Sequence, residues 1–347
     1  MAPLGTAASH RNTIARLIQL GIEVMSNHRS SYGRLTRAAT LFALALASTG
    51  IATANAATDA TSSAFAAAAS KGTDSPVTYT YQTRDYPGAS LTILWGINDF
   101  GELAGQYAIG KGTSHAMVYR HGQFKPLDPD ALGDYFSAAG GPNDYGATFG
   151  GYADASGQQH GFLIQGGHFA TIDFPGHLNS NLDQVNMFGA IAGVYWDADG
   201  IYHGVLRRGP GFDTPINVAG ARDTYPLGIN DNGDIVGYWD TNPAQKHGFY
   251  RSANGQYSTV DVPNAVSTVT LEINDRGQIT GNYEDASGGV HGFVETQGKF
   301  QNIDVPGAVA TVGTAINNVG VIAGEYYDAA GNQHGFTATP IETSRHN

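Results

Sequence analysis

The chain has 347 residues and a formal net charge of −12, with 47 glycines, no cysteine and 14% charged residues. Residues 57–347 hold 13 basic and 29 acidic side chains, and this excess of negative charge disfavours nucleic acid and anionic membrane surfaces as partners. The lack of cysteine excludes disulfides, thiolate metal sites and a cysteine nucleophile. Abundant glycine beside tyrosine and phenylalanine is typical of many short strands joined by tight turns.

The first 56 residues predict a secretory signal. Basic Arg29, Arg34 and Arg37 precede a short apolar stretch, and small Ala54 and Ala56 form an A-x-A cleavage site. The alternative is a membrane anchor, but the apolar stretch falls well short of the roughly 20 residues that a membrane-spanning helix needs. No membrane insertion is therefore expected after the signal is cleaved.

The start of the mature protein is predicted from the same segment. Met25 is expected to be the true initiator, because the residues before it are unusual for a signal peptide. The mature chain is expected to begin near Ala57, after general secretion, since no adjacent arginine pair precedes the apolar stretch. Residues 57–76, rich in Ala, Ser and Thr, predict a flexible linker. The protein is thus expected to be periplasmic or extracellular, and a monomer.

Six asparagines recur at spacings of 45, 43, 44, 44 and 43 residues. In every copy a glycine stands three residues after the asparagine, another glycine seven after, an aromatic residue nine after and a histidine seventeen after. The asparagines are Asn98, Asn143, Asn186, Asn230, Asn274 and Asn317, and the histidines are His115, His160, His203, His247, His291 and His334. A repeat of this length indicates a propeller or a solenoid.

Each copy predicts four short strands. The first ends at the asparagine and turns through the first glycine, such as Gly233, and the second alternates around the next glycine, such as Gly237. The third carries His-Gly-Phe and the fourth Ile-Asp-x-Pro. Four antiparallel strands per copy form a propeller blade. The sequence therefore predicts an all-β, six-bladed β-propeller over residues 77–340, with a tail at 341–347.

The sixth copy lacks the fourth-strand motif, which stands instead at the other end of the domain. Asp85 precedes Asn98 by the same interval by which Asp304 precedes Asn317. We therefore expect residues 77–86 to pair as the outer strand of the last blade. This N-terminal strand would close the ring and leave no open edge between blades.

With these offsets, residues 85–336 resemble the bacterial extracellular repeat proteins named the HAF family for a His-Ala-Phe signature. The signature is His-Gly-Phe in four copies and differs in the tripeptides that begin at His115 and His203. The Asn-x-x-Gly-x-Ile-x-Gly pattern strengthens the match. The resemblance implies a repeat-built propeller and export, and it transfers no active site.

The residues shared by all six copies are predicted to be structural. Six histidines in register suggest a metal ring, but a residue that every blade demands equally is usually part of the blade, and His247 shares a strand face with Phe249. We therefore predict structural hydrogen bonding for the histidines, with a ligand role as the alternative, and neither metal nor cofactor. The asparagines are predicted to cap turns, and the glycines to allow close packing against an aromatic ring.

Two other sets of residues are candidates for ligand binding. Hydroxyls stand six residues before each asparagine and would lie near the channel mouth if the first strands line the channel; the alternative is ordinary hydrogen bonding at strand starts. They are Thr92, Ser137, Ser180, Thr224, Thr268 and Thr311. The second set consists of loop residues that the copies do not share, because scaffold demands are shared and ligand demands need not be. These include Asp134, Tyr135, His177, Asn179, Asp183, Arg222, Asp223, Tyr225 and Lys246.

No catalytic signature is present, so no catalytic residue is predicted. There is no G-x-S-x-G or H-E-x-x-H motif, and residues 105–112 match a phosphate-binding loop only in part. We predict a non-catalytic binding module that recognises a glycan, a cell-wall polymer or a protein through one propeller face, with Tyr135, His177, Arg222 and Tyr225 in contact. The alternatives are a hydrolase or lyase acting on a polysaccharide or small molecule at the channel mouth, and a purely structural surface protein.

Overall fold

The computed structural model describes residues 77–110, 112–127, 136–174, 179–209, 213–243 and 245–341. The predicted signal and linker lie outside these residues, as do Tyr135, His177 and residues 342–347 of the tail. The described residues form strands and turns, and among them no helix is long and apolar enough to cross a bilayer.

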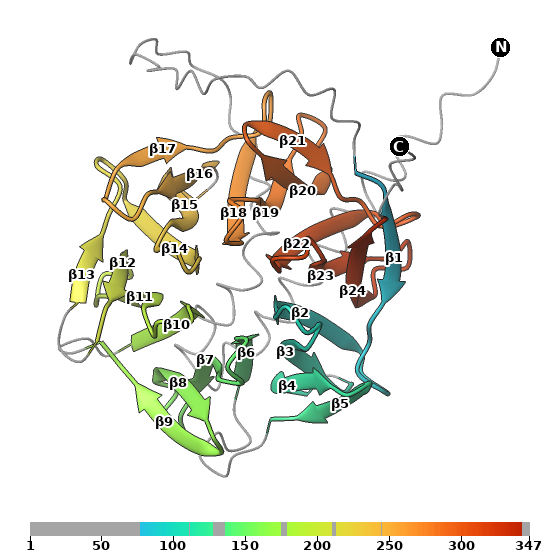
Figure 1. Ribbon diagram of the computed structural model, residues 1–347, viewed down its shortest axis with the longest axis horizontal. Helices are drawn as coiled ribbons and strands as arrows, with labels where there is room; N and C mark the ends of the chain where they lie inside the picture. Colours follow the sequence, from blue (N-terminus) through green and yellow to red (C-terminus); the bar gives the residue numbers. More distant parts are fainter. Residues whose placement is uncertain are drawn as a thin grey trace, which may run out of the picture.

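Antiparallel pairing groups the strands into units of four, arranged in a ring (Figure 1). Single parallel bridges, Val290 with Ala310 and Leu91 with Gln333, also join three of these units into one 12-stranded sheet. Blade 1 contains β2 (Leu91–Ile97), β3 (Leu103–Ala108), β4 (His115–Arg120) and β5 (Gln123–Pro126). Blade 2 contains β6 (Ser137–Pro142), β7 (Thr148–Ala153), β8 (Gln159–Gln165) and β9 (His168–Ile172). Blade 3 contains β10 (Asn179–Val185), β11 (Ile191–Trp196), β12 (Tyr202–Arg207) and β13 (Asp213–Ile216).

The second half of the ring repeats the arrangement. Blade 4 contains β14 (Asp223–Ile229), β15 (Ile235–Asn242), β16 (Gln245–Arg251) and β17 (Tyr257–Thr259). Blade 5 contains β18 (Ser267–Ile273), β19 (Ile279–Glu284), β20 (Val290–Thr296) and β21 (Lys299–Asn302). Blade 6 contains β22 (Ala310–Ile316), β23 (Ile322–Tyr327), β24 (Gln333–Pro340) and, as its fourth strand, β1 (Tyr79–Thr83). The predicted propeller of four-stranded repeats is confirmed.

The ring is closed by the N-terminal strand, as the sequence predicted. β1 pairs antiparallel with β24 from Tyr79 opposite Pro340 to Thr83 opposite Phe336. The pairing continues where the backbone N–H of Arg84 donates to the carbonyl oxygen of Gly335 at 2.8 Å. Figure 1 shows the blue N-terminal strand lying along the red last blade. The two ends of the folded chain therefore share one sheet, and β1 covers the edge of β24 that would otherwise be unpaired.

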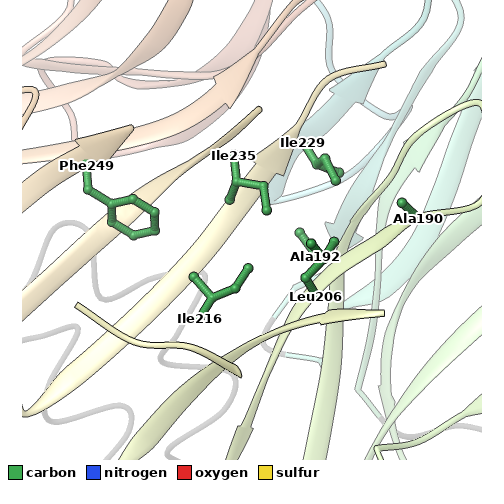
Figure 2. Packing of buried hydrophobic residues seen from close by; sticks show 7 residues of the cluster. All are labelled: Ala190, Ala192, Leu206, Ile216, Ile229, Ile235 and Phe249. Carbon is green, nitrogen blue, oxygen red and sulfur yellow. The ribbon is translucent and has the colours of Figure 1, made fainter. Parts of the chain in front are cut away.

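The hydrophobic core lies between blades. Figure 2 shows the contact of blades 3 and 4, where Ile216 of β13 and Leu206 of β12 face Phe249 of β16 and Ile235 of β15. These side chains are buried, and burying each contributes about 1.5 to 3 kcal/mol. Phe249 packs between blades, as strand alternation predicted. Each blade is thus stabilised mainly by its two neighbours.

The shared histidines join the strands within a blade. The His334 ring stacks on Tyr326, with the ring centres 5.0 Å apart. Its Nδ1 lies 2.7 Å from Oδ2 of Asp85, which precedes the first blade, and its Nε2 lies 3.5 Å from Oδ2 of Asp328. His247 lies in the same way between Trp239 and Asp261. Within the described residues no group of three or more His, Asp or Glu side chains is arranged to hold a metal ion.

Removing β1 should destabilise the last blade. A chain that begins at Ala89 loses the pairing with β24 and the contacts of Asp85, and it exposes a strand edge. We expect its free energy of unfolding to fall by several kcal/mol out of the roughly 5 to 15 kcal/mol typical of a folded domain. Denaturant unfolding of this chain and of one that begins at Val77 measures the difference. Equal midpoints for the two chains would contradict closure by β1.

The stability that His334 contributes should depend on pH. Burial by itself lowers the pKa of His334, but hydrogen bonds and charge attraction from Asp85 and Asp328 outweigh it, so the pKa is raised. A group whose pKa is raised on folding stabilises fully below its unfolded pKa of about 6.5, and this contribution is lost as the pH rises through the folded value. His334→Gln should therefore destabilise more at about pH 5.5 than at about pH 8.5.

Denaturant unfolding at the two pH values checks this. His168→Gln is the matched control, because His168 is exposed on β9 and its replacement should change stability little at either pH. If His334→Gln lowers the free energy of unfolding by the same amount at both pH values, the imidazole stabilises the blade by packing alone.

Candidate functional site

Each shared asparagine caps its own turn, and in five of the six copies its side chain also joins two blades. Oδ1 of Asn274 accepts the backbone N–H groups of Arg276 at 3.1 Å and Gln278 at 2.9 Å. Its Nδ2 donates to the carbonyl oxygen of Asn317 in the next blade at 2.9 Å. The side-chain amides of four more asparagines donate the same bond to the next blade: Asn98, Asn186, Asn230 and Asn317. The acceptor for Asn317 is the carbonyl oxygen of Asn98 in the first blade. The capped turn was predicted from the sequence, whereas the link between blades was not.

A second ring of polar contacts surrounds the channel at the residue after each asparagine. These residues are Asp99, Asp144, Met187, Asp231, Asp275 and Asn318. The five polar side chains each accept the backbone N–H of the equivalent residue in the preceding blade, at 2.7 to 2.8 Å. Met187 has no such acceptor, so this ring of contacts is interrupted between blades 2 and 3.

The second ring surrounds a cavity of about 90 Å³, called here the mouth cavity. Burial raises the pKa of Asp144 and of Asp231, and the charges of Asp99 and Asp275 raise both further. These carboxyl groups are therefore close enough to repel one another. A hydroxyl donor or a positive charge at this mouth would relieve that repulsion.

Apolar side chains project at the tips of four of these turns, two residues after the asparagine. Phe100 is 78% exposed, Phe188 74% and Tyr145 62%, and Val319 and the neighbouring Met187 are also exposed. We call these five residues the aromatic rim. Asn232 and Arg276 occupy the equivalent tips of blades 4 and 5. Sequence reasoning missed the rim, although the most variable position of each turn, between a shared asparagine and a shared glycine, was a signal for it.

The first strand of every blade carries a β-bulge on its way to the turn. In blade 4, Pro226 pairs with Gly237 and Gly228 pairs with Val236, so Leu227 is an inserted residue. A Cβ at Gly237 would overlap the carbonyl oxygen of Tyr225. Glycine is thus required seven residues after the asparagine chiefly because the backbone of the first strand comes so close. The predicted reason, packing against an aromatic ring, is secondary. A bulge bends its strand and redirects a side chain.

All six inserted residues line a central cavity of about 50 Å³, called here the inner cavity. They are Trp95, Gly140, Asp183, Leu227, Leu271 and Thr314. The wall also includes Asn181, Tyr225, Tyr238, Glu272 and Glu325. The first strands therefore line the channel, and they do so with residues that differ from blade to blade.

The acidic groups of the inner cavity are deeply buried. Burial raises the pKa of Glu272 to about 8 and that of Glu325 to about 7, and it raises the pKa of Asp183 well above its ordinary value. Nε2 of Gln184 in blade 3 donates to Oε2 of Glu272 in blade 5 at 2.6 Å. Because Gln184 lines the mouth cavity and Glu272 the inner one, this bond crosses the channel where the two cavities meet.

The six predicted hydroxyls are buried and lie away from both cavities. Five of them accept the backbone N–H of the residue six positions earlier, at 3.0 to 3.2 Å: Thr92, Ser180, Thr224, Thr268 and Thr311. Ser137 accepts the N–H of Ala116 at 2.9 Å. This geometry matches the structural alternative, in which the hydroxyls hold the chain at the start of each first strand.

The unshared loop residues divide into two groups. Tyr225 lies in the wall of the inner cavity, stacked on Tyr238 with the ring centres 4.4 Å apart, and Asp183 lies in the same wall. Arg222 pairs instead with the buried carboxylate of Asp223. Lys246 is buried with its Nζ 5.4 Å from the centre of the Tyr238 ring. Burial lowers the pKa of Lys246 to about 8, against the opposing attraction of Asp240.

Comparison with known proteins supports the fold. No protein-family model matches the chain and no curated protein sequence is similar to it, so the HAF resemblance stays a prediction. A putative TolB from Agrobacterium tumefaciens superposes with a TM-score of 0.50 at 10% identity, over 72% of this chain and 91% of that one. The SapL1 lectin, solved with α-methyl fucoside, gives 0.48 at 12% identity over 74% and 98%. AofleA from Arthrobotrys oligospora gives 0.43 at 13% over 63% and 74%. At such identities the likeness is one of fold: this chain is similar in architecture to known β-propellers.

Proposed function

We propose that this protein is an exported, non-catalytic glycan-binding module, and that it binds a neutral or positively charged glycan at the aromatic rim. The observation that carries the proposal is the exposure of Phe100, Tyr145 and Phe188 on three consecutive blades around an acidic channel mouth. Large apolar side chains exposed together on a soluble protein mark an interaction site.

The mixture of groups at the rim suits a sugar. An aromatic ring offers a flat apolar surface to the C–H face of a pyranose, and carboxylates accept hydrogen bonds from its hydroxyl groups. Phe100 and Tyr145 each follow directly on an aspartate that lines the mouth cavity, Asp99 and Asp144. A large protein partner would require a broader apolar surface, whereas the tips of blades 4 and 5 are the polar Asn232 and Arg276.

The charge of the mouth selects among glycans. Asp99, Asp144, Asp231 and Asp275 already repel one another there, so a uronate, sulfate or phosphate group would add to the repulsion. The excess of acidic over basic residues in the whole domain also repels such anionic groups. Neutral sugars and amino sugars are therefore favoured over acidic polysaccharides.

The test compares binding of the exported protein to neutral xylo-oligosaccharides, cationic glucosamine oligomers and anionic oligogalacturonate. We expect binding to the neutral or cationic oligomers and none to oligogalacturonate. Combined replacement of Phe100, Tyr145 and Phe188 by Ala should weaken binding roughly 100-fold, because each stacking contact is worth about 1 kcal/mol and each 1.4 kcal/mol corresponds to about tenfold in Kd. Calorimetric titration measures both effects.

The matched control replaces three other exposed apolar residues, Ile109, Val266 and Val309, by Ala. This variant should bind as tightly as the unmodified protein, and neither triple replacement should lower the melting temperature appreciably, because exposed side chains contribute little to stability. Binding that survives loss of the three aromatic rings would place the site elsewhere. Release of shorter oligosaccharides during the titration would instead favour a hydrolase or lyase.

A further inference from the structure

The inner cavity combines aromatic faces with buried acidic groups. Trp95, Tyr225 and Tyr238 supply the rings, and Asp183, Glu272 and Glu325 supply the carboxyl groups. The described residues that line the cavity include no Lys, Arg or His side chain. Both kinds of group can bind a positive charge: the rings do so through their negatively polarised faces, and a buried carboxyl group does so by ionising, because a nearby cation lowers its raised pKa.

One of the carboxyl groups is incompletely satisfied. Oδ1 of Asp183 accepts a hydrogen bond from Nδ2 of Asn181 at 2.7 Å. Its Oδ2 is buried and has no hydrogen-bond partner in the described part of the chain, and Asp183 as a whole is only 9% exposed. A buried carboxyl oxygen without a partner costs about 1 to 3 kcal/mol or more. Such an atom in a cavity wall indicates that a hydrogen-bond donor belongs there.

The size of the cavity limits what can enter it. A water molecule needs about 10 to 15 Å³ of such space, so a cavity of about 50 Å³ holds a group of a few heavy atoms and is too small for a pyranose ring. The carboxyl groups also come from separate blades, and the described residues contain no group of three or more His, Asp or Glu side chains placed to coordinate a metal. A small donor that also favours aromatic faces fits better than a metal ion.

We propose that the inner cavity binds a small alkylammonium ion. Its N–H groups would donate to Asp183, and its charge would lie against the aromatic rings of the wall. The molecule already holds one such contact, since the ammonium group of Lys246 lies against the outer side of this region, 5.4 Å from the centre of the Tyr238 ring. This site is independent of glycan binding at the aromatic rim.

The experiment is a calorimetric titration of the full chain with methylammonium chloride, and with potassium chloride at the same ionic strength. Saturable binding of methylammonium without binding of potassium is expected. Asp183→Asn should raise the Kd for methylammonium at least tenfold, because the amide keeps the shape of the side chain but cannot ionise when the cation binds. Asp199→Asn is the matched control, since it removes one charge from an exposed turn, and it should leave the Kd unchanged.

A second variant distinguishes a loss of binding from a folding defect in Asp183→Asn. Glu325→Gln removes a different carboxyl group of the wall and should also weaken methylammonium binding, whereas the triple replacement of the rim aromatics should not affect it. Absence of saturable binding would overturn the proposal. So would equal binding of potassium, or an unchanged Kd in both Asp183→Asn and Glu325→Gln.

Discussion

The hydrogen bonds of the repeated asparagine hold the rest of the structure in place. One side chain caps its own turn and donates to the next blade, so the turn and the spacing between blades are fixed by the same amide group. Five of the six asparagines donate this bond, and in Asn317 it returns from the last blade to the first. Each bond contributes about 1 kcal/mol, and a buried amide left unpaired costs about 1 to 3 kcal/mol. The asparagines thereby arrange the turn tips, and with them Phe100, Tyr145 and Phe188, around one mouth of the channel.

The second constraint is the glycine opposite each bulge. Because Gly237 has no side chain, the first strand of its blade can approach closely and carry the inserted Leu227. The same geometry in other blades carries Trp95 and Asp183 into the wall of the inner cavity. Shared residues therefore build an identical framework six times, while the inserted residue and the turn tip differ from copy to copy. Both positions therefore carry residues specific to single blades, as do other wall residues of the inner cavity such as Glu272 and Glu325.

The fold was predictable because the offsets within the repeat map directly onto strand geometry. The position of Asp85 relative to Asn98 predicted ring closure, since it matched the spacing of Asp304 from Asn317, and β1 pairs as that match required. Strand alternation likewise placed Phe249 between blades.

The site was predicted less well because its residues are not distinguished by their local pattern. Alternation assigns faces only in an unbroken strand, and the bulge at Leu227 breaks the register without any turn signal. The unshared residues predicted from the loops include Tyr225 and Asp183, which line the inner cavity. They also include Arg222, which forms an ion pair with Asp223 instead. The rim residue Phe100 lies inside a turn that begins with a shared asparagine and ends with a shared glycine. Only three-dimensional structure shows that several such tips surround one channel mouth.

The central claim is that ligands bind where the six copies differ, on a framework held by the residues they share. A crystal structure of the protein with a bound oligosaccharide tests it most directly. The account predicts sugar rings stacked on Phe100, Tyr145 or Phe188, with hydroxyl groups directed to the carboxylates of the mouth and the asparagine ring unchanged. Sugar bound instead to equivalent shared residues in several blades, or on the opposite face of the propeller, would contradict it.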